Sequence, residues 1–88
     1  MNRKLTDVLE QIYELIPENG NEKDENLKYL MNKLLSSMSY AAPEKILSNY
    51  YWKELDYIIN YVISEEDYND ENNKHYKKIV DVLINKNW

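Results

Sequence analysis

The sequence predicts a small all-α protein, a bundle of three or four antiparallel helices. Two observations support this prediction. One Gly and two Pro among 88 residues leave few chain breakers, which favours helices over a turn-rich β fold. Apolar residues also recur every three or four positions in four segments, the spacing of one helix face. We expect these helices at about 3–16, 24–40, 43–63 and 70–86, joined by short loops in a single domain that spans residues 1–88.

The first helix is predicted from a single apolar stripe at helical spacing. Its members are Leu5, Val8, Leu9, Ile12, Leu15 and Ile16. Asn2 is suited to cap the N-terminus, and Pro17 disfavours helical geometry at Ile16, where we expect the helix to end. In the connection that follows, the Asn19-Gly20 pair predicts a turn with a positive φ angle.

The second helix shows the same periodicity. Its apolar stripe consists of Leu27, Leu30, Met31, Leu34, Leu35 and Met38. Asp24 is expected as its N-cap, and Glu25 then lies favourably near the positive end of the helix dipole. Pro43 restricts the residue before it, so this helix should end between Ser39 and Ala42.

Pro43 also suits the first position of the third helix, where its missing N–H does no harm. We expect this helix to reach Ile63, and we leave open a break at Ser48-Asn49. One face carries Leu47, Tyr51, Leu55, Ile58, Ile59 and Val62, and a strip directly beside it carries Tyr50, Tyr57 and Tyr61. So wide an arc predicts a helix that packs on more than one side or uses its flank for binding.

The fourth helix follows an acidic connection, residues 64–73, that holds five carboxylates. We expect the helix to begin near Asp70 or Glu71, with Asp70 or Asn69 as its cap. Lys86 complements the dipole at its C-terminus. Its core stripe is Tyr76, Ile79, Val80 and Leu83, with Val82, Ile84 and Trp88 beside it.

The composition predicts a protein that is not an enzyme and that holds no cofactor and no metal. Without Cys there are no thiolate ligands, and a single Gly leaves no phosphate-binding loop. His75 is the only imidazole, and because it lies among Lys74, Lys77 and Lys78 we expect a solvated surface histidine. The acidic connection lacks the central Gly of a calcium-binding loop.

Charge and hydropathy narrow the choice of partners. Apolar runs extend over only a few residues, so no transmembrane helix is predicted, and no helix has the Lys/Arg-rich polar face that binds membrane surfaces. The absence of Cys favours a reducing cytoplasm. A formal net charge of −5 opposes nucleic-acid binding. The basic cluster of Lys74, Lys77 and Lys78 nevertheless leaves a small DNA-binding or regulatory bundle as the alternative.

Two features predict a partner-binding surface. The tyrosine strip of the third helix runs directly into the acidic connection. Tyr supplies a large rigid contact area with a polar hydroxyl, and carboxylates steer a basic partner. The predicted surface consists of Tyr50, Glu54, Tyr57, Tyr61, Glu65, Glu66, Asp67 and Asp70. Two other interpretations stay open: in a chain without Phe the tyrosines can fill the core, or the strip can form a homodimer.

Residue choice points to an AT-rich bacterial or phage genome, because residues with AT-rich codons dominate the chain. In size, charge and predicted helical make-up, the chain is similar to bacterial toxin-immunity proteins and to phage-encoded inhibitors of host nucleases. This similarity implies a non-catalytic, acidic inhibitor of the immunity or antitoxin type, which neutralises a basic partner such as a toxic nuclease. A small helical transcription regulator and a homodimeric adaptor domain are the alternatives.

Overall fold

The computed structural model describes residues 5–42, 44 and 49–85. Within these residues the chain forms helices and no strand, as the sequence predicts. The helices are α1 (Leu5–Leu15), α2 (Glu22–Ser39), α4 (Tyr50–Val62), α5 (Glu65–Tyr68) and α6 (His75–Ile84).

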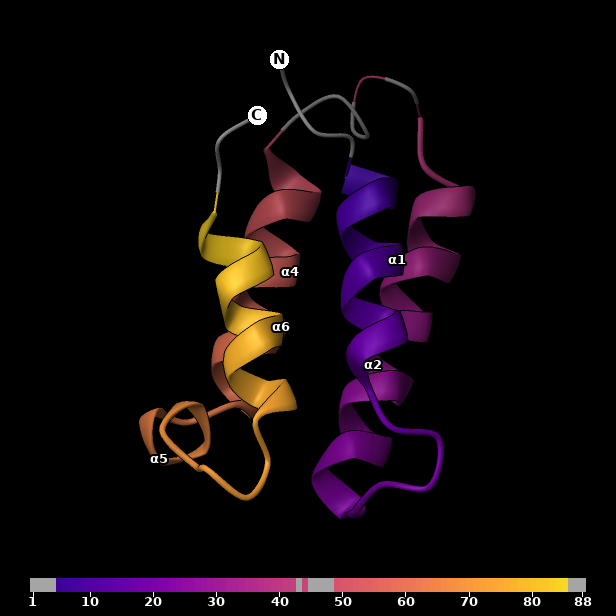
Figure 1. Ribbon diagram of the computed structural model, residues 1–88. Helices are drawn as coiled ribbons and strands as arrows, with labels where there is room; N and C mark the ends of the chain where they lie inside the picture. Colours follow the sequence, from indigo (N-terminus) through magenta and orange to yellow (C-terminus); the bar gives the residue numbers. More distant parts are fainter. Residues whose placement is uncertain (1–4, 43, 45–48, 86–88) are drawn as a thin grey trace.

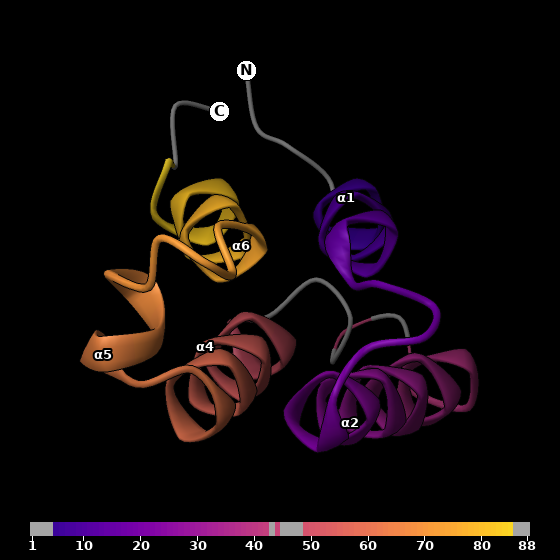
Figure 2. The same ribbon diagram turned by 60° about the horizontal axis from the view of Figure 1, so that its bottom comes forward.

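The four longer helices run antiparallel to their neighbours in the chain (Figure 1). Seen from the end, α1, α2, α4 and α6 occupy the corners of a square, so that α2 and α6 lie at opposite corners (Figure 2). The closest packing joins α2 to α4 and α1 to α6. The short helix α5 lies outside the square and packs against α6.

The predicted apolar stripes meet in one core. It is built from Leu5, Val8, Leu9, Ile12, Ile16, Leu27, Met31, Leu34, Met38, Tyr51, Leu55, Ile58, Ile59, Val62, Ile63, Tyr76, Ile79 and Leu83. Leu15, Leu30 and Val80 are only half-buried at its edge. Leu35, which we expected in the core, is 36% exposed. It lies beyond the edge of the buried stripe of α2, beside Tyr13 of α1.

The start of α2 corrects two predictions. Asp24 is not the N-cap: Asn21 caps the helix, and its side chain accepts a hydrogen bond from the Asp24 N–H at 2.9 Å. Asp24 completes the capping box by accepting from the Asn21 N–H at 3.1 Å. Gly20 has no positive φ angle. It is needed for space instead, because an added Cβ would lie 2.7 Å from the Cγ of Asp24.

The third predicted helix is described only in part. Helix α4 begins at Tyr50, and Asn49 precedes it without a capping side-chain hydrogen bond. Pro43 and Leu47 lie outside the described residues, as do Asn2, Lys86 and Trp88. The predicted core face of α4 is confirmed, with Tyr51, Leu55, Ile58, Ile59 and Val62 all buried.

The acidic connection contains the short helix α5, which we did not predict. Ser64 caps it and forms a capping box with Asp67. Helix α6 then begins at His75, later than the predicted start at Asp70 or Glu71, and neither Asn69 nor Asp70 caps it. The carboxylate of Asp70 accepts hydrogen bonds from the Asn72 N–H and from the Asn73 side chain, both at 2.9 Å. This local turn competes with helix formation and delays it.

Candidate functional site

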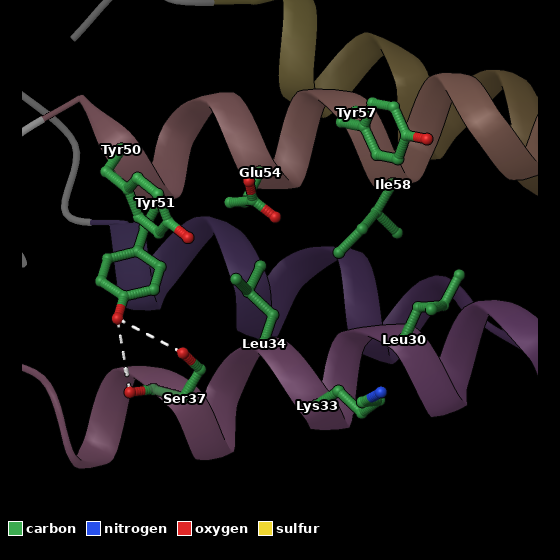
Figure 3. A pocket seen from close by; sticks show the side chains of 9 residues that line it. All are labelled: Leu30, Lys33, Leu34, Ser37, Tyr50, Tyr51, Glu54, Tyr57 and Ile58. Atoms are coloured by element: carbon green, nitrogen blue, oxygen red, sulfur yellow. Dashed lines mark hydrogen bonds between the residues drawn. The ribbon is translucent and has the colours of Figure 1, made fainter.

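Two hollows follow one another along the outer face between α2 and α4, and we call them together the α2–α4 groove. The upper hollow has a volume of about 250 Å³. Leu30, Leu34 and Ile58 lie between the helices there, with Glu54 and Tyr57 of α4 opposite Lys33 of α2 (Figure 3). The lower hollow, at the end where α2 begins, measures about 760 Å³ and is lined by Glu22, Lys23, Glu25, Asn26, Tyr61 and Val62.

The tyrosine strip of α4 forms one rim of this groove. Tyr50, Tyr57 and Tyr61 are 46%, 67% and 70% exposed. The rings of Tyr57 and Tyr61 stack with centroids 6.1 Å apart and join the two hollows. The interpretation that this strip fills the core is therefore wrong, because the buried aromatic positions belong to Tyr51 and Tyr76.

The opposite rim belongs to α2 and was missed by the sequence analysis. Leu30 and Lys33 line the upper hollow, and Glu22 and Glu25 line the lower one. Tyr29 is 58% exposed next to this rim, and the Lys33 ammonium lies 5.5 Å from the centre of its ring. The available signal was the position of Tyr29 one turn before Lys33, off the apolar stripe of its helix.

Carboxylates outnumber free cations along the groove. Glu22, Glu25 and Glu54 line it, together with Lys23 and Lys33. Lys23 does not act as a free cation, because its ammonium forms an ion pair with Asp67 of α5. The lower hollow therefore presents two carboxylates whose neighbouring ammonium group is already neutralised.

The acidic residues that we predicted in the partner-binding surface do not all lie on one surface. Glu54 lies in the groove, and Glu65 and Glu66 are exposed on α5. Asp67 and Asp70 instead form hydrogen bonds within the chain, and Asp67 also forms an ion pair with Lys23. Burial raises the pKa of Asp67, but the hydrogen bonds from Lys23 and Ser64 outweigh burial and hold the pKa below its ordinary value. Hydrogen bonds from Asn73 and Asn72 likewise lower the pKa of Asp70.

His75 is not the solvated histidine that we expected. Its Nε2 lies 2.8 Å from Oδ1 of Asp24, and the two side chains are only 17% and 3% exposed. The Tyr76 hydroxyl donates to Oδ1 of Asn21 at 3.2 Å. Burial, opposed by the bond to Asn21 and reinforced by the nearby Asp24 carboxylate, raises the pKa of Tyr76 to about 12.

This polar group, Asn21, Asp24, His75 and Tyr76, is a structural connection between α2 and α6. In the described part of the chain, every buried side-chain nitrogen and oxygen has a hydrogen-bond partner. The group therefore holds no buried polar atom in reserve for a substrate.

The basic cluster of α6 lies in a hollow of mixed charge. Lys74, Lys77 and Lys78 share it with an equal number of carboxylates, Asp70, Glu71 and Asp81. The Tyr68 hydroxyl donates to Asp81 at 2.8 Å, and the Lys77 ammonium lies 5.9 Å from the centre of the Tyr68 ring. Carboxylates so close to the lysines oppose the neutralisation of phosphates.

Across residues 5–42, 44 and 49–85, no three His, Cys, Asp or Glu side chains are grouped so that they could hold a metal ion. In that same part of the chain, no helix is both long and apolar enough to cross a bilayer. No family model, curated protein sequence or solved structure matches this chain.

Proposed function

We propose that the protein binds a positively charged protein partner through the α2–α4 groove and acts as a non-catalytic, stoichiometric inhibitor of that partner. One observation carries the proposal: exposed tyrosines and unneutralised carboxylates line the same groove between two packed helices. A toxic nuclease is the concrete candidate, because it must bind a polyanion and therefore carries a basic cleft. An acidic domain can cover such a cleft in the way that immunity proteins and antitoxins do, and we propose the cytoplasm as the site of action.

The tyrosines supply the contact energy in this proposal. Tyr57 and Tyr61 offer large rigid rings whose immobilisation costs little side-chain entropy. Residues of this kind dominate binding energy when a partner encloses them. Leu30, Leu34 and Ile58 give the upper hollow an apolar floor for one side chain of the partner.

The carboxylates supply orientation and association rate. Glu54 lies beside the upper hollow and Glu22 and Glu25 beside the lower one, so cationic groups of the partner are drawn to both. Glu65 and Glu66 extend the acidic field beyond the end of α4. A net charge of −5 adds long-range attraction that salt weakens.

A second copy of the chain is the competing occupant, because an exposed tyrosine face can pair with itself. Light scattering over a range of concentrations separates the two cases. A mobility-shift assay at low salt tests the DNA-binding alternative, in which the lysines of α6 would contact phosphates.

The proposal is tested by capture of partners from a bacterial lysate on the tagged protein, followed by affinity measurement with the purified partner. We expect one basic protein at one-to-one stoichiometry, with an affinity that falls as salt rises. Tyr57→Ala should weaken binding by about 10-fold or more, as for an anchor residue. The matched control is Tyr40→Ala, since Tyr40 is 92% exposed but lines neither hollow. Equal affinities for the two variants would place the binding surface elsewhere.

A further inference from the structure

The ion pair between Lys23 and Asp67 has two ends with different surroundings. The Lys23 backbone belongs to the first turn of α2, and the residue lines the lower hollow between Glu22 and Glu25. Asp67 belongs to α5, across the bundle end, and does not line the groove. The ammonium of a groove residue is thus bound to a carboxylate outside the groove.

Asp67 is itself held firmly in place. Its Oδ2 accepts hydrogen bonds from the Ser64 N–H at 2.8 Å and from the Ser64 hydroxyl at 3.0 Å. The same oxygen contacts Lys23, and the Asp67 side chain is only 16% exposed. A carboxylate held by a capping box is restrained from swinging away, so it presents a counter-charge to Lys23 at a fixed place.

We propose that Asp67 is a positioning residue that holds the Lys23 ammonium out of the lower hollow and so keeps that hollow acidic. This inference rests on the proposed function, because it matters for binding only if the negative charge of the groove attracts the partner. Direct contact with the partner, which the sequence predicts for Asp67, is replaced by an indirect role. Without Asp67, the Lys23 side chain is free to turn toward Glu22 and Glu25 and to neutralise the carboxylates that attract a cationic group.

The surroundings of Lys23 support this assignment. The Lys23 ammonium also lies 6.0 Å from the centre of the Tyr76 ring, which is a weaker attraction than a carboxylate. Lys33, the other lysine of the groove, is drawn toward Tyr29 on its own helix. Each lysine of the groove thus has a neighbour that is not one of the groove carboxylates, Asp67 for Lys23 and the Tyr29 ring for Lys33.

The test reads the electrostatic potential of the free protein and needs no partner. A cationic and an anionic nitroxide of similar size are added to the labelled protein, and their relaxation enhancements are compared at the amides of Asn26 and Tyr61. A negative lower hollow attracts the cation and repels the anion. Four proteins form a double-mutant cycle: the unmodified chain, Asp67→Asn, Lys23→Gln, and both changes together.

We expect Asp67→Asn to lower the cation-to-anion ratio at Asn26 and Tyr61 by about twofold, the effect of one charge moved to within about 8 Å at moderate salt. In the Lys23→Gln background the same change should have a smaller effect, because no ammonium is left to move into the hollow. Amides near Glu54 in the upper hollow should not respond. An equal fall in both backgrounds would overturn the inference, since it would reflect only the lost charge of Asp67.

Ser64→Ala is the control for the helix cap. It removes the Ser64 hydroxyl, one of the two Ser64 groups that bond to Oδ2 of Asp67, but keeps both charges of the ion pair and the Ser64 N–H, so the ratio should fall by clearly less than in Asp67→Asn. If Ser64→Ala reproduced the whole fall, loss of the helix cap rather than loss of the Asp67 charge would be the cause and the inference would fail. The groove itself is tested separately by Tyr57→Ala, so each proposal can fail without the other.

Discussion

Oδ1 of Asp24 lies 2.8 Å from Nε2 of His75, although 51 residues separate them in the chain. Asp24 occupies the first turn of α2, and His75 is the first residue of α6. Both helix N-termini point to the same end of the bundle (Figure 1), so one buried carboxylate lies near the positive ends of two helix dipoles. The contact fixes two helices that occupy opposite corners of the bundle.

Asp24→Ala should destabilise the protein by about 2–4 kcal/mol, because it removes a buried carboxylate that completes the capping box of α2 and pairs with His75. Urea denaturation measures this loss. Glu25→Ala is the matched control, an exposed acid in the same helical turn, and should change stability by less than about 0.5 kcal/mol. Similar values for the two variants would contradict the role given to Asp24.

Gly20→Ala should destabilise the protein by about 1–3 kcal/mol through overpacking, because a Cβ there overlaps the Asp24 side chain. Thermal unfolding detects the change. Asn19→Ala, at the exposed preceding position, should leave the melting temperature nearly unchanged. A stable Gly20→Ala variant would show that the turn does not need this glycine.

Leu34→Ala should cost about 2–4 kcal/mol, whereas Leu35→Ala should cost less than about 1 kcal/mol. The neighbours have the same side chain, but Leu34 is 5% exposed and Leu35 is 36% exposed. Chemical denaturation of both variants under one set of conditions gives the comparison. The reverse order would mean that α2 is rotated about its axis.

The stabilising effect of Asp67 should be lost at acidic pH. Its folded pKa lies below the ordinary value of 3.8, so the unfolded chain binds this proton more readily than the folded protein does. Asp67 therefore adds stability above about pH 4, and this is lost as the pH falls through the folded pKa. The difference in unfolding free energy between the unmodified chain and Asp67→Asn should shrink below about pH 4. Glu66→Gln, at an exposed position of the same short helix, serves as the charge-matched control.

Tyr76 should lose its proton only in strong alkali. Because its pKa is raised from 10.0 to about 12, the folded protein retains a proton that the unfolded chain releases earlier. This contribution to stability is complete below pH 10 and is lost as the pH rises toward 12. Ultraviolet titration of tyrosinate should show a late-ionising group that disappears in Tyr76→Phe. A titration in which Tyr76→Phe removes an ordinary, early group would contradict the buried environment.

The sequence predicted the helices well because burial follows the period of the apolar residues. Leu27, Met31 and Leu34 are buried as that period requires. Helix starts were harder, because Asn21 and Asp24 are both good caps and the choice between them depends on His75 and Tyr76 far along the chain. Neither the partly buried position of His75 nor the pairing of Lys23 with Asp67 has a local signal.

In the candidate site, the α4 rim could be predicted from helical periodicity, but the α2 rim could not. The strip on α4 follows from helical spacing, which also places Tyr51 on the buried face and its neighbour Tyr50 on the exposed strip. The α2 rim depends on which helix lies beside α4, and periodicity does not determine that neighbour.

The hydroxyl of Tyr51 lies 3.4 Å from both the hydroxyl and the carbonyl oxygen of Ser37 at the upper end of the groove (Figure 3). At the other end Lys23 is bound to Asp67 of α5, so α2 is tied to α4 at one end of the groove and to the short helix that follows α4 at the other. If a protein docks in the groove as proposed, these contacts limit the ordering required of α2, so the entropy lost on association comes mainly from the docking partner. Affinity can then be tuned by exposed rim side chains without disturbing the bundle beneath them.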